Sequence, residues 1–402
     1  MSFKIHFRPK LLDTLSGYGK QDFQTDLIAG ITVGIVALPL AMAFGIASGA
    51  TPESGLFTAV IAGFIISAFG GSRVQIGGPT GAFIVVIFTI IADYGFADLL
   101  LCTLMAGGML FLMGLFRLGG IIKYVPYPVI AGFTSGIAVL IFVTQIPDFL
   151  GLQVEEMPAP FFDKMVVVWN HLSTFHLPAV LVATISLILI FRWPKKWADK
   201  VPGMIVALIL GTIVVTLFNI PMETIGSRFG GIPQGLPKFT MLEISVEKLK
   251  VLFQPALAIA LLGGIESLLS AAVADGMIED RHDSNQELMA QGLANIAVPF
   301  FGGIPATGAI ARTATNVKNG GKTPLAGIVH AITLLIIVLV AAPLVKYVPL
   351  ACLSAVLMVV AFNMGEWHHF RRLPTWPRGD AIVFLLVFSL TVLFDIVFAI
   401  EA

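Results

Sequence analysis

The sequence predicts an all-α integral membrane protein, built as two inverted repeats of seven spans (7+7) with one broken half-helix in each. Three observations carry this prediction. Of the 402 residues, 57% are hydrophobic and only 12% are charged, against roughly a quarter charged in soluble domains. Apolar runs long enough to cross a bilayer recur along the whole chain. Two similar motifs, 227 positions apart, suggest that the chain divides into matching halves.

The two motifs interrupt helices at corresponding places. The first is Gly-Gly-Pro-Thr-Gly-Ala-Phe at residues 77–83, and the second is Gly-Gly-Ile-Pro-Ala-Thr-Gly-Ala-Ile at residues 302–310. We expect each to open a short apolar run that cannot cross a bilayer alone. Gly and Pro stop a helix and leave the first N–H groups of the next one free. A matched pair of broken helices is typical of the central binding site of a membrane transporter.

The order of the spans predicts opposite topologies for the two halves. We expect an N-terminal cytoplasmic segment (1–25), a first repeat of seven spans (26–220), a polar linker (221–250) and a second repeat of six spans (251–402). An odd number of spans in a repeat inverts the next one. The same offset places Pro39, within the first span, opposite Glu266, within the eighth. Chance resemblance between Gly- and Ala-rich membrane segments is the alternative.

Basic residues predict the orientation. If the N-terminus is cytoplasmic, most of the 24 Lys and Arg residues fall in cytoplasmic loops, as the positive-inside rule requires. The first 25 residues are polar and basic, which argues against a cleavable signal peptide. The net charge is zero, and no basic cluster suggests nucleic acid. We expect no disulfide, metal site or cofactor, and the lack of a nucleophile–base pair, phosphate loop or redox motif argues against an enzyme.

The half-helix ends form the candidate anion site. Each would direct free N–H groups and roughly half a positive elementary charge toward the middle of the membrane. Thr80 and Thr307 add hydroxyl donors, and Gly81 and Gly308 allow close approach to the backbone. The alternative is that these residues only break and cap helices.

Arg312 and Glu266 are the charged residues expected at membrane depth near this site. A charge there costs on the order of 3 kcal/mol. Arg312 would supply fixed positive charge to the anion, or else snorkel to the cytoplasm or pair with Glu266. Glu266 stands in an apolar span and could carry a coupling proton or bind a cation, with Ser270 on the same helix face completing an oxygen site. A structural ion pair with Arg312 is the alternative.

Several motifs together resemble the SulP family of anion transporters. In the second half they are Ile-Glu-Ser-Leu-Leu-Ser (265–270), Ala-Asp-Gly-Met (274–277), Ser-Asn-Gln-Glu-Leu (284–288), Gln-Gly-Leu-Ala-Asn (291–295), Phe-Gly-Gly (301–303) and Arg-Thr (312–313). In the first half they are Gly-Leu-Phe (55–57), Gly-Gly-Ser-Arg (70–73) and the first broken-helix motif. The resemblance implies a core domain (spans 1–4 and 8–11), a gate domain (spans 5–7 and 12–14), elevator-like movement, a homodimer surrounded by lipid, and a bacterial inner membrane location.

The resemblance also assigns residues. The family's anion site falls on Thr80 and its neighbours, on Gly308 and Ala309, and more loosely on Arg312. A sodium site of bicarbonate-transporting members falls on Glu266, Ser270, Gly308, Ala309 and Ile310. Those members look to carry Asp in place of Glu266 and a hydroxyl residue in place of Ile310, which favours a proton over sodium. The sequence stops at Ala402, before the family's fourteenth helix and its usual STAS domain, so we expect a piece of a longer protein.

Three functions fit these observations. The first is a secondary transporter of sulfate, bicarbonate or a dicarboxylate, coupled to H⁺ or Na⁺. The second is an uncoupled anion channel or exchanger on the same scaffold. Glu266 argues against it, because a passive pore needs no titratable group at this position. The third is a nucleobase–cation symporter of related fold. Carboxylates near both broken helices would favour this function, and only Glu266 is present here.

Overall fold

The computed structural model describes residues 7–120, 126–154, 157–198, 201–232 and 235–393, and within them it is mostly helical. The first half holds α1 (Lys10–Thr14), α2 (Lys20–Ala47), α3 (Pro52–Phe69), β1 (Gly77–Gly78), η1 (Gly81–Phe83), α4 (Ile84–Tyr94), α5 (Phe96–Leu115), α6 (Tyr127–Leu150), α7 (Phe161–His171), η3 (Leu172–Thr174), α8 (Leu177–Arg192), α9 (Lys195–Ala198) and α10 (Gly203–Leu217). The linker holds α11 (Ile225–Phe229) and α12 (Val246–Val251). The second half holds α13 (Phe253–Ile278), α14 (Ser284–Ala297), η4 (Val298–Phe301), β2 (Thr307–Gly308), α15 (Ile310–Lys318), α16 (Pro324–Val345), α17 (Leu350–Met364), α18 (Trp367–Arg372), η5 (Leu373–Thr375) and α19 (Arg378–Leu393). The end of the second repeat, 394–402, lies outside the described residues.

The helices are apolar enough for a membrane. In the described part, seven helical segments have the length and composition to cross a bilayer: α2, α3, α5, α6, α13, α16, and the segment Leu350–Thr375 that contains α17 and α18. Two shorter apolar helical segments, Gly81–Tyr94 and Gly203–Leu217, accompany them. The chain is a multi-pass membrane protein.

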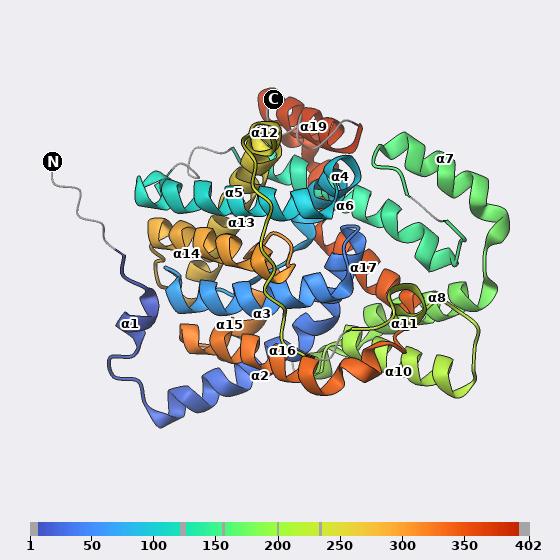
Figure 1. Cartoon of the computed structure of the whole chain (residues 1–402), viewed down its shortest axis with the longest axis horizontal. Helices are drawn as coiled ribbons and strands as arrows, with labels where there is room; N and C mark the ends of the chain where they lie inside the picture. Colours follow the sequence, from blue (N-terminus) through green and yellow to red (C-terminus); the bar gives the residue numbers. More distant parts are fainter. Residues whose placement is uncertain (1–6, 121–125, 155–156, 199–200, 233–234, 394–402) are drawn as a thin grey trace.

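Helices of the two halves interleave with twofold pseudosymmetry. In Figure 1, α5, α14, α3, α16 and α2 follow one another across one side of the molecule, and first-half helices (blue and teal) alternate with second-half helices (gold and orange). α5 packs on α13 and α14, and α16, its counterpart in the other half, packs on α2 and α3. A reciprocal pattern of this kind is what an inverted repeat produces.

A second group of helices stands beside these. α6 packs on α8, α17 and α19, and α17 also packs on α8 and α10. In Figure 1, α7, α8 and α10 lie on the side away from α14 and α15. We call the first group (α2–α5 and α13–α16) the core and the second (α6–α10 and α17–α19) the gate.

The two broken helices are joined by backbone pairing. β1 and β2 form a two-stranded antiparallel ladder, in which Gly77 pairs with Gly308 and Gly78 with Thr307. Next to the ladder, the Ala309 N–H donates to the Ile76 carbonyl over 2.8 Å. Extended backbone at membrane depth needs such partners, because lipid offers none. The ladder therefore holds the starts of the two half-helices next to each other.

The expectation that both motifs open apolar runs is wrong for the second one. α4 is apolar, but α15 carries Arg312, Thr313 and Asn316, all of them buried. Their polar atoms reach the segment before β1: Asn316 Nδ2 donates to the Val74 carbonyl over 2.9 Å, and Thr313 Oγ1 accepts the Ile76 N–H over 3.0 Å. α15 is polar because it supplies hydrogen bonds to unwound backbone of the first half.

Buried side chains from the opposite half hold the turns that precede each strand. The Glu287 carboxylate of α14 accepts the N–H groups of Gly71 and Ser72 at 2.9 and 3.2 Å. In the matching turn of the second half, Thr58 Oγ1 of α3 accepts the Ile304 N–H over 2.7 Å. Within the second half itself, Asn295 of α14 accepts the Ala306 N–H over 2.9 Å and donates to the Ala306 carbonyl over 2.8 Å. Each half therefore depends on the other for its broken-helix turn.

Replacing Asn295 by Leu should destabilise the fold, because it leaves the N–H and C=O of Ala306 without partners in a buried place. Each unsatisfied buried group costs about 1–3 kcal/mol. We expect a clear drop in the thermal unfolding midpoint in detergent. Asn319→Ala is the matched control, since Asn319 Nδ2 only bonds the Thr315 carbonyl at a helix end. Equal midpoints for Asn295→Leu and the control would show that Asn295 does not hold this turn.

Candidate anion-binding site

The start of the first half-helix lies against the middle of α13. Thr80 is the residue before η1, and its Oγ1 donates to Glu266 Oε2 over 3.1 Å. Thr80 is buried and Glu266 is half-buried. Gly81 begins η1, and a side chain there would meet Met364 of α17 and Ile141 of α6. The expected anion residues of the first half thus stand where the core faces the gate.

Arg312 brings positive charge from the second half to this place. Its side chain is only 2% exposed, so it does not snorkel to either surface. Nη2 donates to the Pro79 carbonyl, one residue before Thr80. Nη1 is buried and has no hydrogen-bond partner in the described part of the chain. Arg312 and Glu266, both described, form no ion pair within 4 Å, so the structural pairing considered above is not seen.

The second-half residues of the candidate site are already engaged. Thr307 Oγ1 donates to the Gly263 carbonyl over 2.8 Å, and the Ala309 N–H bonds Ile76. Gly308 lies in the ladder, and a Cβ there would overlap the Gln75 side chain. These residues close the turn and position it. The free N–H groups at this end are then those of the first turn of α15, which begins at Ile310.

The residues expected to hold a coupling ion are only partly gathered. Ser270 is buried on α13, and its Oγ lies 3.3 Å from Thr313 Oγ1. Ile310 is 39% exposed and offers no side-chain oxygen. α13 also extends to Ile278 and holds a second carboxylate, Asp275, which bonds the His282 ring at 2.7 Å near the end of the helix. Glu266 is the carboxylate of α13 that lies beside Thr80.

Gln75 is the residue that sequence reasoning missed. It is buried between the halves, its Nε2 donates to Ser267 Oγ over 3.0 Å, and its Oε1 has no partner within the described residues. The available sequence signal was an uncharged amide two residues before the Gly-Gly-Pro break. The amide end of Gln75 lies against Gly308, so this side chain packs directly beside the candidate site.

Comparison with known proteins decides the family. The family model described as "Sulfate permease family" matches residues 23–387. The chain belongs to the sulfate permease family. It is 53% identical over 382 residues to "Putative sulfate transporter YvdB" of Bacillus subtilis, which covers 95% of this chain and 72% of that protein. It is 33% identical to "Bicarbonate transporter BicA" of Picosynechococcus, covering 99% of this chain and 69% of that protein.

Solved structures agree on the fold of this sulfate permease family member. The transmembrane domain of a cyanobacterial bicarbonate transporter BicA superposes with a TM-score of 0.87 at 34% identity, covering 96% of this chain and 99% of that one. SLC26A9 superposes with a TM-score of 0.87 at 18% identity, covering 98% of this chain and 66% of that one, which supports the fold alone. The fold is therefore the inverted-repeat transporter fold with core and gate, and the protein is a transporter rather than an enzyme. The comparisons do not support the nucleobase–cation symporter considered above.

Proposed function

We propose that the protein is a secondary active transporter of a small oxyanion, sulfate or bicarbonate first among them, and that Glu266 carries a coupling proton. The observation that supports anion binding best is the buried Arg312 Nη1, which has no partner among the described residues. A buried guanidinium is stable only if its donors are satisfied. An oxyanion between the first turns of η1 and α15 would accept hydrogen bonds from Arg312 Nη1 and from the N–H groups at the two helix ends.

The proposed coupling to a proton follows from the surroundings of Glu266. Sodium needs several oxygen ligands, and Ile310 offers none from its side chain. A single carboxyl group can instead take up a proton with one hydrogen-bond partner, here Thr80 Oγ1. Because Thr80 is also the expected anion ligand, protonation of Glu266 and anion binding would share one hydroxyl. That shared partner provides a direct route for coupling.

The proposed movement is an elevator-like shift of the core against the gate. The β1–β2 ladder makes the two half-helix starts one body, so the site would move as a unit. η1 and α4 pack on α6 of the gate, and the contacts around Gly81 are apolar. Near the middle of α4, the Lys164 ammonium of α7 lies 4.8 Å from the centre of the Phe88 ring. We propose a cytoplasmic N-terminus, which the distribution of basic residues supports.

Transport by purified protein in liposomes tests this function. Uptake of labelled sulfate, bicarbonate and a dicarboxylate should be measured with an inward pH gradient, with an inward sodium gradient at fixed pH, and with neither. We expect one oxyanion to accumulate in the liposomes. The amount accumulated should increase with the pH gradient and should not depend on sodium. Uptake that only equilibrates the anion across the membrane, without accumulation, would favour the channel. No uptake of any of the three anions would reject the proposal.

Replacing Thr80 by Val tests the placement of the anion without adding bulk. Val has nearly the shape of Thr but donates no hydrogen bond, so we expect the KM for the anion to rise about tenfold, the worth of one hydrogen bond to a charged group. Thr89→Val, on the same half-helix but beyond its first turn, is the matched control. An unchanged KM for Thr80→Val would remove the hydroxyl from the site. Gly308→Trp is less suitable, because it would displace Gln75 whether or not an anion binds there.

A further inference from the structure

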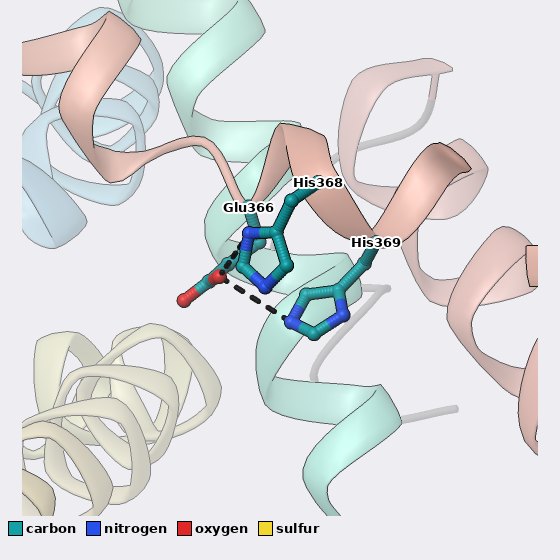
Figure 2. A group of neighbouring side chains, drawn as sticks. All are labelled: Glu366, His368 and His369. Atoms are coloured by element: carbon teal, nitrogen blue, oxygen red, sulfur yellow. Dashed lines mark ion pairs between the residues drawn. The ribbon is translucent and has the colours of Figure 1, made fainter. Parts of the chain in front are cut away.

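The gate carries a cluster of nitrogen and oxygen ligands that the transport site does not use. Glu266 and Arg312 lie in the core, whereas Glu366, His368 and His369 lie at the start of α18, which follows α17 in the gate. Figure 2 shows the Glu366 carboxylate and the two imidazole rings turned toward one another. The Glu366 Oε2 atom lies 3.5 Å from His368 Nδ1 and 3.4 Å from His369 Nε2. One ligand atom from each residue lies within 4.8 Å of the others.

These distances suit one metal ion. In a tetrahedral zinc site with bonds of about 2.0–2.1 Å, neighbouring ligand atoms are about 3.3–3.4 Å apart. The two distances from Glu366 Oε2 are close to this value, and the ligand atoms of His368 and His369 lie within 4.8 Å of each other. Two imidazoles and one carboxylate suit zinc, nickel or copper better than magnesium or calcium, which prefer oxygen ligands.

The surroundings allow a metal to enter and hold the ring of one ligand in place by packing. The His368 and Glu366 side chains are 58% and 36% exposed, so the cluster opens to its surroundings, while the His369 side chain is 11% exposed. His369 packs beside Trp376, and Tyr127 Oη lies 2.7 Å from its Nε2. The buried His369 Nδ1 has no partner in the described part of the chain. A fixed, partly desolvated ring next to two accessible ligands is a built site rather than a chance meeting of exposed side chains.

We propose that Glu366, His368 and His369 bind a transition metal ion of the zinc type, with water as the fourth ligand. Tyr127 is the first residue of α6, and its hydroxyl contacts the same nitrogen that would ligate the metal. Metal binding would therefore replace the hydrogen bond between α6 and α18 by a metal–nitrogen bond. The bound metal would therefore weaken the contact between α6 and α18. It would also join α18 to the segment after α17, because Glu366 lies between these two helices.

Zinc binding to the purified protein tests the site. The protein should carry an affinity tag without histidine and be treated with chelator before titration with zinc alone, followed by calorimetry and by thermal unfolding. We expect one zinc per chain and a higher unfolding midpoint with zinc. His368→Ala and Glu366→Gln should each weaken zinc binding by about tenfold or more, since loss even of an outer-shell partner costs 10–100-fold.

His171→Ala is the matched control, because the His171 ring lies on α7 and bonds the Val167 carbonyl of its own helix. It should bind zinc like the wild type. Tyr127→Phe removes the hydroxyl that contacts His369 Nε2 and should therefore bind zinc more tightly. If zinc were attracted only by the charge of Glu366, this change would have no effect. Wild-type affinity in both His368→Ala and Glu366→Gln, or no zinc uptake by the wild type, would overturn the proposal. Unchanged elution volume and unfolding midpoint of the metal-free variants would establish that the losses are not due to misfolding.

Discussion

Glu266→Gln should abolish accumulation of the anion against its gradient while leaving exchange of labelled for unlabelled anion in place. Gln resembles the protonated carboxyl group in shape and can still accept the hydrogen bond from Thr80 Oγ1, which spans 3.1 Å in the wild type. The side chain can no longer release a proton, so the pH gradient has no means of driving the cycle. Exchange needs no net proton movement and should continue. Counterflow and gradient-driven uptake, measured in the same liposomes, separate the two activities.

The pH dependence gives a second reading of the same variant. If Glu266 carries the proton, wild-type uptake should rise as the outside becomes more acidic, and Glu266→Gln should lose this dependence. Ser270→Ala serves as the control, because it removes the hydroxyl of the sodium alternative but leaves the carboxyl group in place. Sodium-dependent uptake that Ser270→Ala weakens would point to sodium. Concentrative uptake by Glu266→Gln at the wild-type rate would rule out this role for the residue.

Arg312→Ala should raise the KM for the anion by about tenfold to a hundredfold. A hydrogen bond to a charged group contributes about 1.5–3 kcal/mol, and each 1.4 kcal/mol corresponds to a factor of ten. Some loss of stability should accompany this, because Nη2 also donates to the Pro79 carbonyl. The amount of folded protein, measured by gel filtration in detergent, separates the two effects.

Arg312→Lys distinguishes the charge from the geometry. Lysine keeps the positive charge but cannot bond Pro79 and an anion as two arms of one planar group. It should recover part of the affinity lost in Arg312→Ala. A native KM in Arg312→Ala would show that the residue only joins the two halves and that the site relies on helix ends.

The sequence was sufficient for the fold because membrane helices are specified locally. Apolar runs, Gly-Gly breaks and an internal repeat can each be read from neighbouring residues, and they placed Thr80, Glu266 and Arg312 correctly in the half-helices and in α13. That Thr80 meets Glu266 follows from packing between segments 186 residues apart. No local pattern encodes such a contact, and the sequence left an ion pair between Glu266 and Arg312 open as an alternative.

The side-chain roles in the second half were harder to predict for the same reason. Whether the Thr307 hydroxyl faces an anion or the Gly263 carbonyl depends on the ladder register, which pairs Thr307 with Gly78. The sequence predicted an apolar second half-helix, and only the hydrogen bonds of α15 to the unwound backbone at Val74 and Ile76 explain why this helix is polar. The role of Gln75 was not predicted, because a single amide near a helix break is only a weak signal and has no characteristic spacing.

The ladder between β1 and β2 also constrains how the chain is made. Synthesis delivers Gly77 and Gly78 long before Thr307 and Gly308 leave the ribosome. Until then the backbone groups of the first strand have no partner, and lipid would impose a cost of several kcal/mol on each. We therefore expect the first broken helix to remain in a hydrated place, at the membrane surface or within the insertion machinery, until the second half arrives. Assembly of the binding site would then be one of the last steps of biogenesis. If synthesis stopped before β2, the first half could not insert stably into the bilayer.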